Sequence, residues 1–233
     1  MSPERIVTAD PAAFVARAAE WIADSLRESV RRRGSCTLAL AGGETPVPVY
    51  QRVAELPALP WHRTAIYFTD ERAVPPEHPD SNYRRAAESL LSRVDLSPGA
   101  IHRMPAERPD REQAAAEYAA LLPDPIDVLL LGMGIDGHTA SLFPHSPALA
   151  ETQRRVVPVN GGTPLLPRLT ITPPVIRSAR SLLMLVAGAA KAEPVVRALE
   201  GPQDFTALPA QLARRGTWIL DRAAAAKLAG TIQ

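Results

Sequence analysis

Short, continuous apolar runs alternate along the chain with longer segments in which apolar residues recur every three or four positions. Apolar runs that stop at glycine or at a charged residue are typical of strands buried on both faces of a sheet. On this basis we predict strands at residues 36–41, 64–69, 126–132, 181–188 and 217–221.

The segments between these runs carry the spacing of amphipathic helices. The first helix begins where Asp10 precedes Pro11, a pair that caps and opens helices, and Gly34 ends it after three arginines. Further helices are predicted at residues 47–56, 82–94, 111–121, 190–199 and 223–228.

Alternation of strand and helix predicts a parallel α/β sheet. No Gly/Ser-rich linker divides the chain, so we predict a single domain over residues 1–233. The proline-rich stretch that follows Thr69 is predicted to be a loop, with Asp80 or Ser81 capping the next helix.

Composition excludes several classes of protein. The 26 basic and 25 acidic residues leave a formal net charge of +1, which argues against a general nucleic-acid-binding protein. Cys36 is the single cysteine, which excludes an internal disulfide framework and a multi-cysteine zinc site. No apolar stretch is long enough to span a membrane, and the opening MSPERIVTAD lacks the apolar region of a secretory signal. We expect a cytoplasmic monomer or small homo-oligomer that binds a small molecule and neither membranes nor nucleic acid.

Chemically distinctive residues cluster directly after the predicted strands. In a parallel sheet the carboxyl ends of the strands meet at one edge, where open α/β sheets bind their ligands. The residues that follow strands in this way are Gly42, Gly43, Asp70, Glu71, Arg72, Asp136, His138 and Lys191. The sequence therefore predicts one ligand site at this edge.

Several of these segments suggest anion binding. In AGGETP, residues 41–46, two glycines and Thr45 lead into a helix whose free N–H groups can bind an anion, although the same glycines also suit a simple tight turn. Arg72 stands in a charged triplet that is otherwise typical of a solvated loop, and it can bind a phosphate through two hydrogen bonds. Lys191 opposes the dipole of the helix that it opens, which suggests a purpose such as phosphate binding rather than a plain surface position. Arg168, before a proline-bounded turn, is a weaker candidate.

The segment GMGIDGH, residues 132–138, combines three glycines with Asp136 and His138. A histidine, whose ordinary pKa is about 6.5, can accept and return a proton at neutral pH, and an aspartate two residues away can orient its ring. The glycine N–H groups can face a developing oxyanion. The alternative is a helix-capping aspartate beside a structural histidine, and the position at the ligand edge favours the catalytic interpretation.

Taken in order, these motifs resemble those of the 6-phosphogluconolactonases, in the sugar-phosphate isomerase/deaminase-like superfamily. The resemblance runs from LALAGGETP through YFTDERAVPPEHPDSNYR, DVLLLGMGIDGHTASLFP, RLTITPPVI and VAGAAKAE to TWILDRAA, and DGHTASLFP is its most specific block. It implies a Rossmann-like, doubly wound, mostly parallel sheet with helices on both faces in three layers. It also implies hydrolysis of 6-phospho-D-glucono-1,5-lactone in the pentose phosphate pathway, without a cofactor or metal.

The resemblance also implies roles for single residues. His138 matches the proposed base of the family, and Arg72 and Lys191 match residues at the substrate phosphate. Arg168 matches an arginine that lies near the same site. Glu44 stands where the family usually has serine, so we expect its carboxylate to point away from the phosphate or to contact a basic side chain.

Two alternative functions remain. The related amino-sugar-phosphate deaminases share the DGH turn but follow it with a catalytic glutamate, where this chain has Phe143. An apolar ring cannot transfer a proton, so this alternative is disfavoured. The other alternative is a phosphosugar-binding module on the same fold, which would bind the sugar phosphate without turning it over. His145 is a further departure from the family, because it follows SLFP where a glycine is expected.

Overall fold

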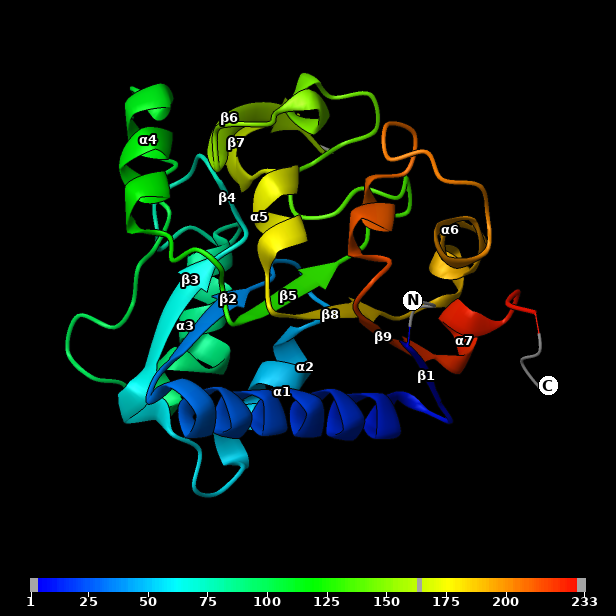
Figure 1. Ribbon diagram of the computed structural model, residues 1–233, viewed down its shortest axis with the longest axis horizontal. Coiled ribbons are helices and arrows are strands. Elements are labelled where there is room, and N and C mark those ends of the chain that lie inside the picture. Colours follow the sequence, from blue (N-terminus) through cyan, green and yellow to red (C-terminus); the bar gives the residue numbers. More distant parts are fainter. Residues whose placement is uncertain (1–3, 163–164, 230–233) are drawn as a thin grey trace.

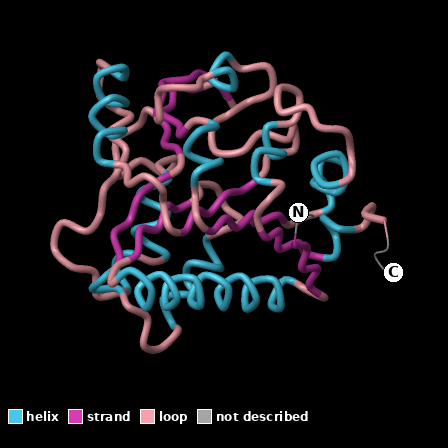
Figure 2. The backbone as a smooth tube through the Cα atoms, viewed as in Figure 1, coloured by secondary structure: helices cyan, strands magenta, loops and turns pink. Residues whose placement is uncertain are grey.

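The computed structural model describes residues 4–162 and 165–229 and has a six-stranded sheet at its centre (Figure 1 and Figure 2). The strands lie in the order β1-β9-β8-β5-β2-β3, and neighbouring strands are parallel. Their bounds are Glu4–Thr8 for β1, Cys36–Leu40 for β2, Thr64–Phe68 for β3, Val128–Gly132 for β5, Ser181–Val186 for β8 and Thr217–Asp221 for β9. Residues 1–3, 163–164 and 230–233 lie outside the described residues. They belong to the single domain that we predicted over residues 1–233, and residues 1–3 also belong to the segment MSPERIVTAD.

The strands predicted from apolar runs are confirmed, with ends that differ by at most two residues. In β5, Leu129, Leu130 and Leu131 are all fully buried, as expected of a strand covered on both faces. Strand β1 was not predicted. It lies at the edge of the sheet beside β9, where Ile6 pairs with Ile219, and most of its residues are exposed, so it lacks a continuous apolar run.

Helices cover both faces of the sheet, which confirms the three-layer α/β/α arrangement. In Figure 1, α1 (Pro11–Arg33) and α2 (Val47–Glu55) lie below the sheet and α5 (Pro173–Ser178) lies above it. The remaining helices are α3 at Asn82–Ser89, α4 at Arg111–Leu121, α6 at Ala192–Leu199 and α7 at Arg222–Ala225. Helix α5 was not predicted, because a six-residue helix is too short to show a period. None of the helices in the described part of the chain is long and apolar enough to cross a membrane.

Helix α1 begins and ends at the residues predicted for it. The Asp10 side chain accepts a hydrogen bond from the Ala13 N–H at 2.8 Å, and Pro11 takes the first helical position. Gly34 ends the helix with a φ of 79°, and its N–H donates to the Val30 carbonyl at 2.8 Å. The prediction for α3 was partly wrong: Ser81 caps it as predicted, but the helix stops at Ser89 and a 3₁₀ turn follows.

A second, antiparallel sheet was missed by the sequence analysis. It has the order β4-β7-β6, with β4 at Asp70–Arg72, β6 at Val156–Gly161 and β7 at Leu166–Ile171. The charged triplet predicted as the start of a loop is therefore a strand, and Arg168 lies within β7 rather than before a turn. A three-residue strand has no readable period, and its partner is distant in sequence.

Thr69 joins the two sheets. Its N–H donates to the Leu40 carbonyl of β2 at 3.0 Å, and its own carbonyl accepts from the Ile171 N–H at the end of β7 at 2.9 Å. In Figure 1, β6 and β7 accordingly lie above the central sheet. The small sheet thus extends from the carboxyl edge of the large one.

The order of strands creates a crevice between β2 and β5. From β2 the chain continues outward to β3, whereas from β5 it continues in the opposite direction to β8 and β9. Two neighbouring strands whose connections diverge leave a gap beyond their carboxyl ends, and open α/β sheets bind ligands in such gaps. The segments that follow β2 and β5 are AGGETP and GMGIDGH.

Candidate active site

A pocket of about 230 Å³ occupies the carboxyl edge at this crevice. Its walls come from the segments after β2, β3 and β5, from β4 and β7, from the start of α3 and from Lys191 just before α6. Of the predicted site residues, it brings together Gly42, Gly43, Thr45, Asp70, Arg72, His138, Arg168 and Lys191. Glu71 and Asp136 do not line it.

Asp136 lies directly behind His138. The two atoms Asp136 Oδ1 and His138 Nδ1 are 2.6 Å apart, and the His138 backbone N–H also donates to Asp136 Oδ1 at 3.1 Å. Gly134 makes this arrangement possible, since a Cβ on Gly134 would lie 2.1 Å from His138 Nδ1 and 2.5 Å from Asp136 Oδ1. The glycine-rich turn therefore folds back beneath its own aspartate–histidine pair.

The pair defines which nitrogen of His138 is available for chemistry. An ionised carboxylate only accepts hydrogen bonds, so the proton between the two groups belongs to His138 Nδ1. Nε2 is then left with a lone pair. Partial burial by itself raises the pKa of Asp136, but the hydrogen bond and charge of His138 outweigh it and hold this pKa below its usual value. Asp136 is thus ionised at neutral pH and suited to orient the ring.

Two arginines face each other across the small sheet. Arg72 in β4 and Arg168 in β7 are direct partners in the antiparallel register, and both line the pocket. Like charges directly opposite on a sheet are destabilising unless an anion lies between or beside them. Arg72 Nε is also buried without a hydrogen-bond partner among the described residues. Both features indicate a site that is built for an anionic group.

Arg168 is held by a buried polar network. Its Nε donates to the Gly161 carbonyl at 3.1 Å, and its Nη1 lies 3.4 Å from Ser141 Oγ and 3.9 Å from Asp70 Oδ2. Ser141 Oγ in turn donates to Asp70 Oδ2 at 2.6 Å. Burial lowers the pKa of Arg168, with the Asp70 charge opposing, and an arginine stays protonated in either case. Asp70 therefore acts as an anchor beneath the arginine and compensates part of its charge.

Lys191 adds a third positive charge to the pocket. It occupies the position immediately before α6, as predicted, at the end of the 3₁₀ turn Ala189–Lys191. Partial burial lowers its pKa, and the charge of Asp136 opposes this effect. Lys191 therefore lies close enough to the Asp136–His138 pair to interact with it electrostatically.

The AGGETP turn follows β2 along the floor of the crevice. Gly42 approaches Asn82 so closely that a Cβ there would lie 2.2 Å from the Asn82 amide nitrogen, and Gly43 has a φ of 88°. Glu44 is 92% exposed and lies 3.7 Å from Arg85. Glu44 also lines the pocket, so of the two alternatives expected for its carboxylate, contact with a basic side chain is the one observed.

Two predictions about this edge need correction. Glu71 turns away from the pocket and is buried at the start of α3, where its carboxylate accepts from the backbone N–H groups of Arg72, Asn82 and Tyr83 at 2.8 Å each. Alternation along β4 explains this, since neighbouring residues of a strand point to opposite faces. The N–H groups of Gly134 and Gly137, predicted to face an oxyanion, donate instead to the His138 and Gly134 carbonyls within their own turn.

Glu71 is expected to contribute to stability. Burial raises its pKa, while its N–H donors favour the carboxylate, and Ser81 Oγ donates a further hydrogen bond at 3.0 Å. Glu71→Gln turns one acceptor into an NH₂ group facing donors, which should lower the free energy of unfolding by roughly 1–3 kcal/mol. Urea denaturation of this variant beside Glu77→Gln, an exposed glutamate of the same segment, measures the difference. Equal stability of the two variants would contradict the capping role.

Sequence reasoning overlooked Asn82 as part of the pocket wall. Its side-chain amide donates to the Asp70 carbonyl at 3.0 Å and to Asp70 Oδ1 at 3.2 Å, while its buried Oδ1 has no partner among the described residues. Its position at a predicted helix start gave no sign of this contact. Ser141 was likewise not predicted to anchor Arg168, and it carries no motif that indicates such a role.

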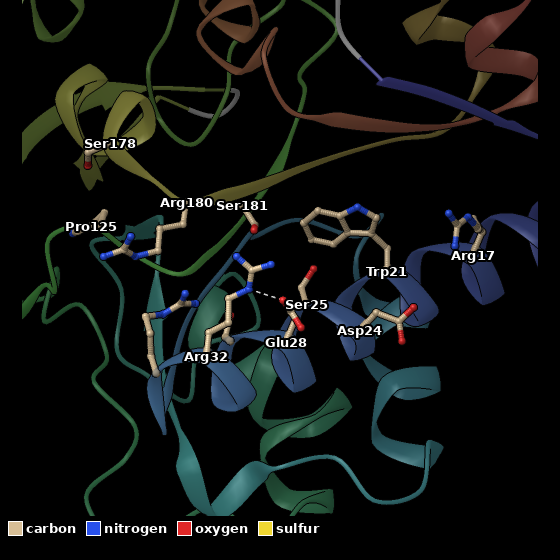
Figure 3. A pocket seen from close by; sticks show the side chains of 12 residues that line it. Arg17, Trp21, Asp24, Ser25, Glu28, Arg32, Pro125, Ser178, Arg180 and Ser181 are labelled. Carbon is tan, nitrogen blue, oxygen red and sulfur yellow. Dashed lines mark hydrogen bonds and ion pairs between the residues drawn. The ribbon is translucent and has the colours of Figure 1, made fainter. Parts of the chain in front are cut away.

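A larger cavity, of about 770 Å³, lies at the opposite edge of the sheet between α1 and the start of β8 (Figure 3). It is rich in arginine, but its cations have carboxylate partners: Arg33 lies 2.7 Å and Arg180 3.4 Å from Asp127, and Arg32 pairs with Glu28. Of these ion pairs, the one between Arg33 and Asp127 connects the end of α1 to the start of β5. In the smaller pocket, by contrast, Arg72 and Arg168 are direct partners in the sheet register, and Asp70 compensates part of their charge.

Comparison with known proteins identifies the family. Residues 9–220 match the family model of the glucosamine-6-phosphate isomerases/6-phosphogluconolactonase. The chain belongs to this family. It is 38% identical to the 6-phosphogluconolactonase of Synechocystis sp., over 98% of this chain and 99% of that protein. It is 35% identical to the 6-phosphogluconolactonase of Mycobacterium tuberculosis over the same shares of the two chains.

Solved structures of the family have the same fold. The 6-phosphogluconolactonase from Trypanosoma cruzi matches with a TM-score of 0.85 and 28% identity over 98% of both chains. A monomeric glucosamine-6-phosphate deaminase matches with a TM-score of 0.84 at 23% identity, which shows the shared fold alone. Within this family the chemistry of individual residues, rather than the backbone, has to distinguish the two activities.

Proposed function

We propose that this member of the family hydrolyses 6-phospho-D-glucono-1,5-lactone to 6-phospho-D-gluconate. The observation that carries the proposal is the Asp136–His138 pair, because its histidine lines the same pocket as three cationic side chains. Hydrolysis of a lactone requires a base that deprotonates a water molecule beside the carbonyl carbon. Binding of a phosphorylated lactone also requires positive charge around its phosphate group. The relatives that match nearly the whole chain carry the name of this activity.

The phosphate is bound by Arg72, Arg168 and Lys191. Arg72 contributes the guanidinium with an unpartnered, buried Nε, and Arg168 contributes a guanidinium already fixed by Gly161 and Ser141. A phosphate dianion at this position relieves the repulsion between the two opposed arginines. Binding energy from the phosphate then holds the lactone ring beside His138.

His138 Nε2 accepts a proton from a water molecule as the water oxygen forms a bond to C1 of the lactone. The resulting tetrahedral intermediate carries the former carbonyl oxygen as an oxyanion, and the N–H groups of the Gly42–Gly43 turn stabilise it. Its collapse breaks the bond between C1 and the ring oxygen, which takes the proton back from His138. The carboxylic acid that forms ionises in solution, so His138 returns to its starting state.

The ionised Asp136 supports both proton transfers. It holds the imidazole through Nδ1, which leaves Nε2 free, and it stabilises the imidazolium between the two steps. General acid–base catalysis of this kind supplies about 10²–10⁴-fold, and positioning adds to it. A lactone is already an activated ester, so these contributions suffice for a useful rate.

The test is a turnover assay with three substrates. Freshly prepared 6-phosphogluconolactone near neutral pH, with spontaneous hydrolysis subtracted, should be opened rapidly, whereas gluconolactone without phosphate should be a far poorer substrate. Release of ammonia from glucosamine 6-phosphate should be absent, because Phe143 cannot transfer protons. Ammonia release without lactonase activity would replace the proposal with a deaminase. Binding of 6-phosphogluconate without any turnover would replace it with a binding module.

A further inference from the structure

The ring of Phe143 lies against both functional groups of the pocket. Its centroid is 4.8 Å from that of the His138 ring, with 47° between the two planes. The Arg168 Cζ atom lies 5.5 Å from the same ring centroid, within the distance of a cation–π interaction. One side chain therefore contacts the proton-transferring residue and an arginine of the anion site.

The backbone of β6 leaves room for this contact. A Cβ on Gly161 would lie 2.1 Å from Phe143 Cε2, and the Gly161 carbonyl accepts the hydrogen bond from Arg168 Nε. A Cβ on the following Gly162 would lie 2.2 Å from Arg168 Nη2. The end of β6 thus presses on the aromatic ring and on the guanidinium at the same time, which leaves both with little freedom to move.

The turn that connects His138 with Phe143 is itself fixed. Thr139 Oγ1 donates to the Gly132 carbonyl at 2.8 Å, and the Leu142 N–H donates to the Thr139 carbonyl at 2.9 Å. Ser141 within this turn is fully buried and bonded to Asp70. The ring of Phe143 is therefore held from its own turn as well as from β6.

We propose that Phe143 is a positioning residue that couples His138 to Arg168, an inference that rests on the proposed function. The ring blocks rotation of the imidazole away from Asp136 and limits movement of the guanidinium. It also presents π-electron density to both groups when His138 becomes a cation during turnover, which offsets the repulsion between imidazolium and guanidinium. Loss of the ring should consequently affect both the chemical step and substrate binding.

The first experiment is Phe143→Leu, which keeps an apolar side chain and removes the π-electrons. A cation–π interaction of about 0.5–2 kcal/mol corresponds to an effect of about 2- to 30-fold. We expect kcat to fall and KM for 6-phosphogluconolactone to rise, each within this range. A change in thermal stability alone, with kcat and KM unaltered, would assign Phe143 a structural role and overturn the inference.

A double-mutant cycle tests the contact itself. Gly161 does not occupy the left-handed region, so alanine can adopt its backbone conformation, but the new Cβ must displace the Phe143 ring. Gly161→Ala should lower kcat/KM in the wild-type background and have little further effect in a Phe143→Ala background. Equal losses in the two backgrounds would show that the ring is not what the methyl group displaces, and would refute the coupling.

A spectroscopic readout separates this inference from the proposed function. In the wild-type protein the nearby Phe143 ring should shift the imidazole C–H resonances of His138, which are assigned by their loss in His138→Ala. Phe143→Leu should move these resonances toward the values of an unstacked histidine. This experiment needs no turnover, so an inactive wild-type protein would refute the lactonase proposal alone. If the wild-type protein is active but Phe143→Leu leaves the His138 resonances at their wild-type positions, the positioning role alone is refuted.

Discussion

Replacing His138 with alanine should lower kcat for 6-phosphogluconolactone by about 10²–10⁴-fold while KM changes little. The imidazole supplies the one nitrogen, Nε2, that can accept a proton from water while Nδ1 is bound to Asp136. The ring is 30% exposed and packs against Phe143 at the pocket, so the fold should remain intact. Steady-state kinetics and circular dichroism of the variant and the wild-type protein measure both expectations.

The matched control for this experiment is His62→Ala. His62 is exposed in the 3₁₀ turn before β3, at the other end of that strand from the pocket, and its loss should leave kcat unchanged. Asp136→Asn should give an intermediate loss, because the ring remains but the group that orients it is weakened. Wild-type turnover by His138→Ala would move the base elsewhere and overturn the proposed mechanism.

Arg72→Ala should raise KM for 6-phosphogluconolactone by about 10- to 150-fold, with a smaller effect on kcat. This range corresponds to the roughly 1.5–3 kcal/mol of a hydrogen bond to a charged group. The variant should also lose its preference for the phosphorylated lactone over gluconolactone. The comparison of kcat/KM for the two lactones measures this preference directly, since the substrates differ only in the phosphate.

Stability provides a second readout for the arginine pair. Without phosphate, the repulsion between Arg72 and Arg168 across β4 and β7 opposes the hydrogen bond that Arg72 Nη1 donates to the Asp80 carbonyl, so Arg72→Ala should be about as stable as the wild-type protein. Inorganic phosphate should raise the Tm of the wild-type protein and have a smaller effect on the variant. Arg180→Ala, at the opposite edge of the sheet, is the control and should leave KM unchanged. An unaltered KM in Arg72→Ala would exclude the phosphate-binding role.

Much of this protein was readable from local sequence. Apolar runs predicted five of the six strands of the central sheet, because a strand buried on both faces must be apolar along its length. The pair Asp10 and Pro11 predicted the start of α1, because caps act through neighbouring residues. Asp136 and His138 were recognised together because both belong to one short turn. All of these features depend on interactions that span only a few positions along the chain.

The tertiary structure decided which residues from distant segments of the chain come into contact. The antiparallel register of β4 and β7 brings Arg72 opposite Arg168, and the alternation along β4 turns Glu71 toward α3 instead of the pocket. The ring of Phe143 reaches Arg168 only because Gly161, at the end of another strand, leaves room for it. Such contacts depend on pairing, register and packing between segments that no local period encodes, so they follow from the folded chain alone.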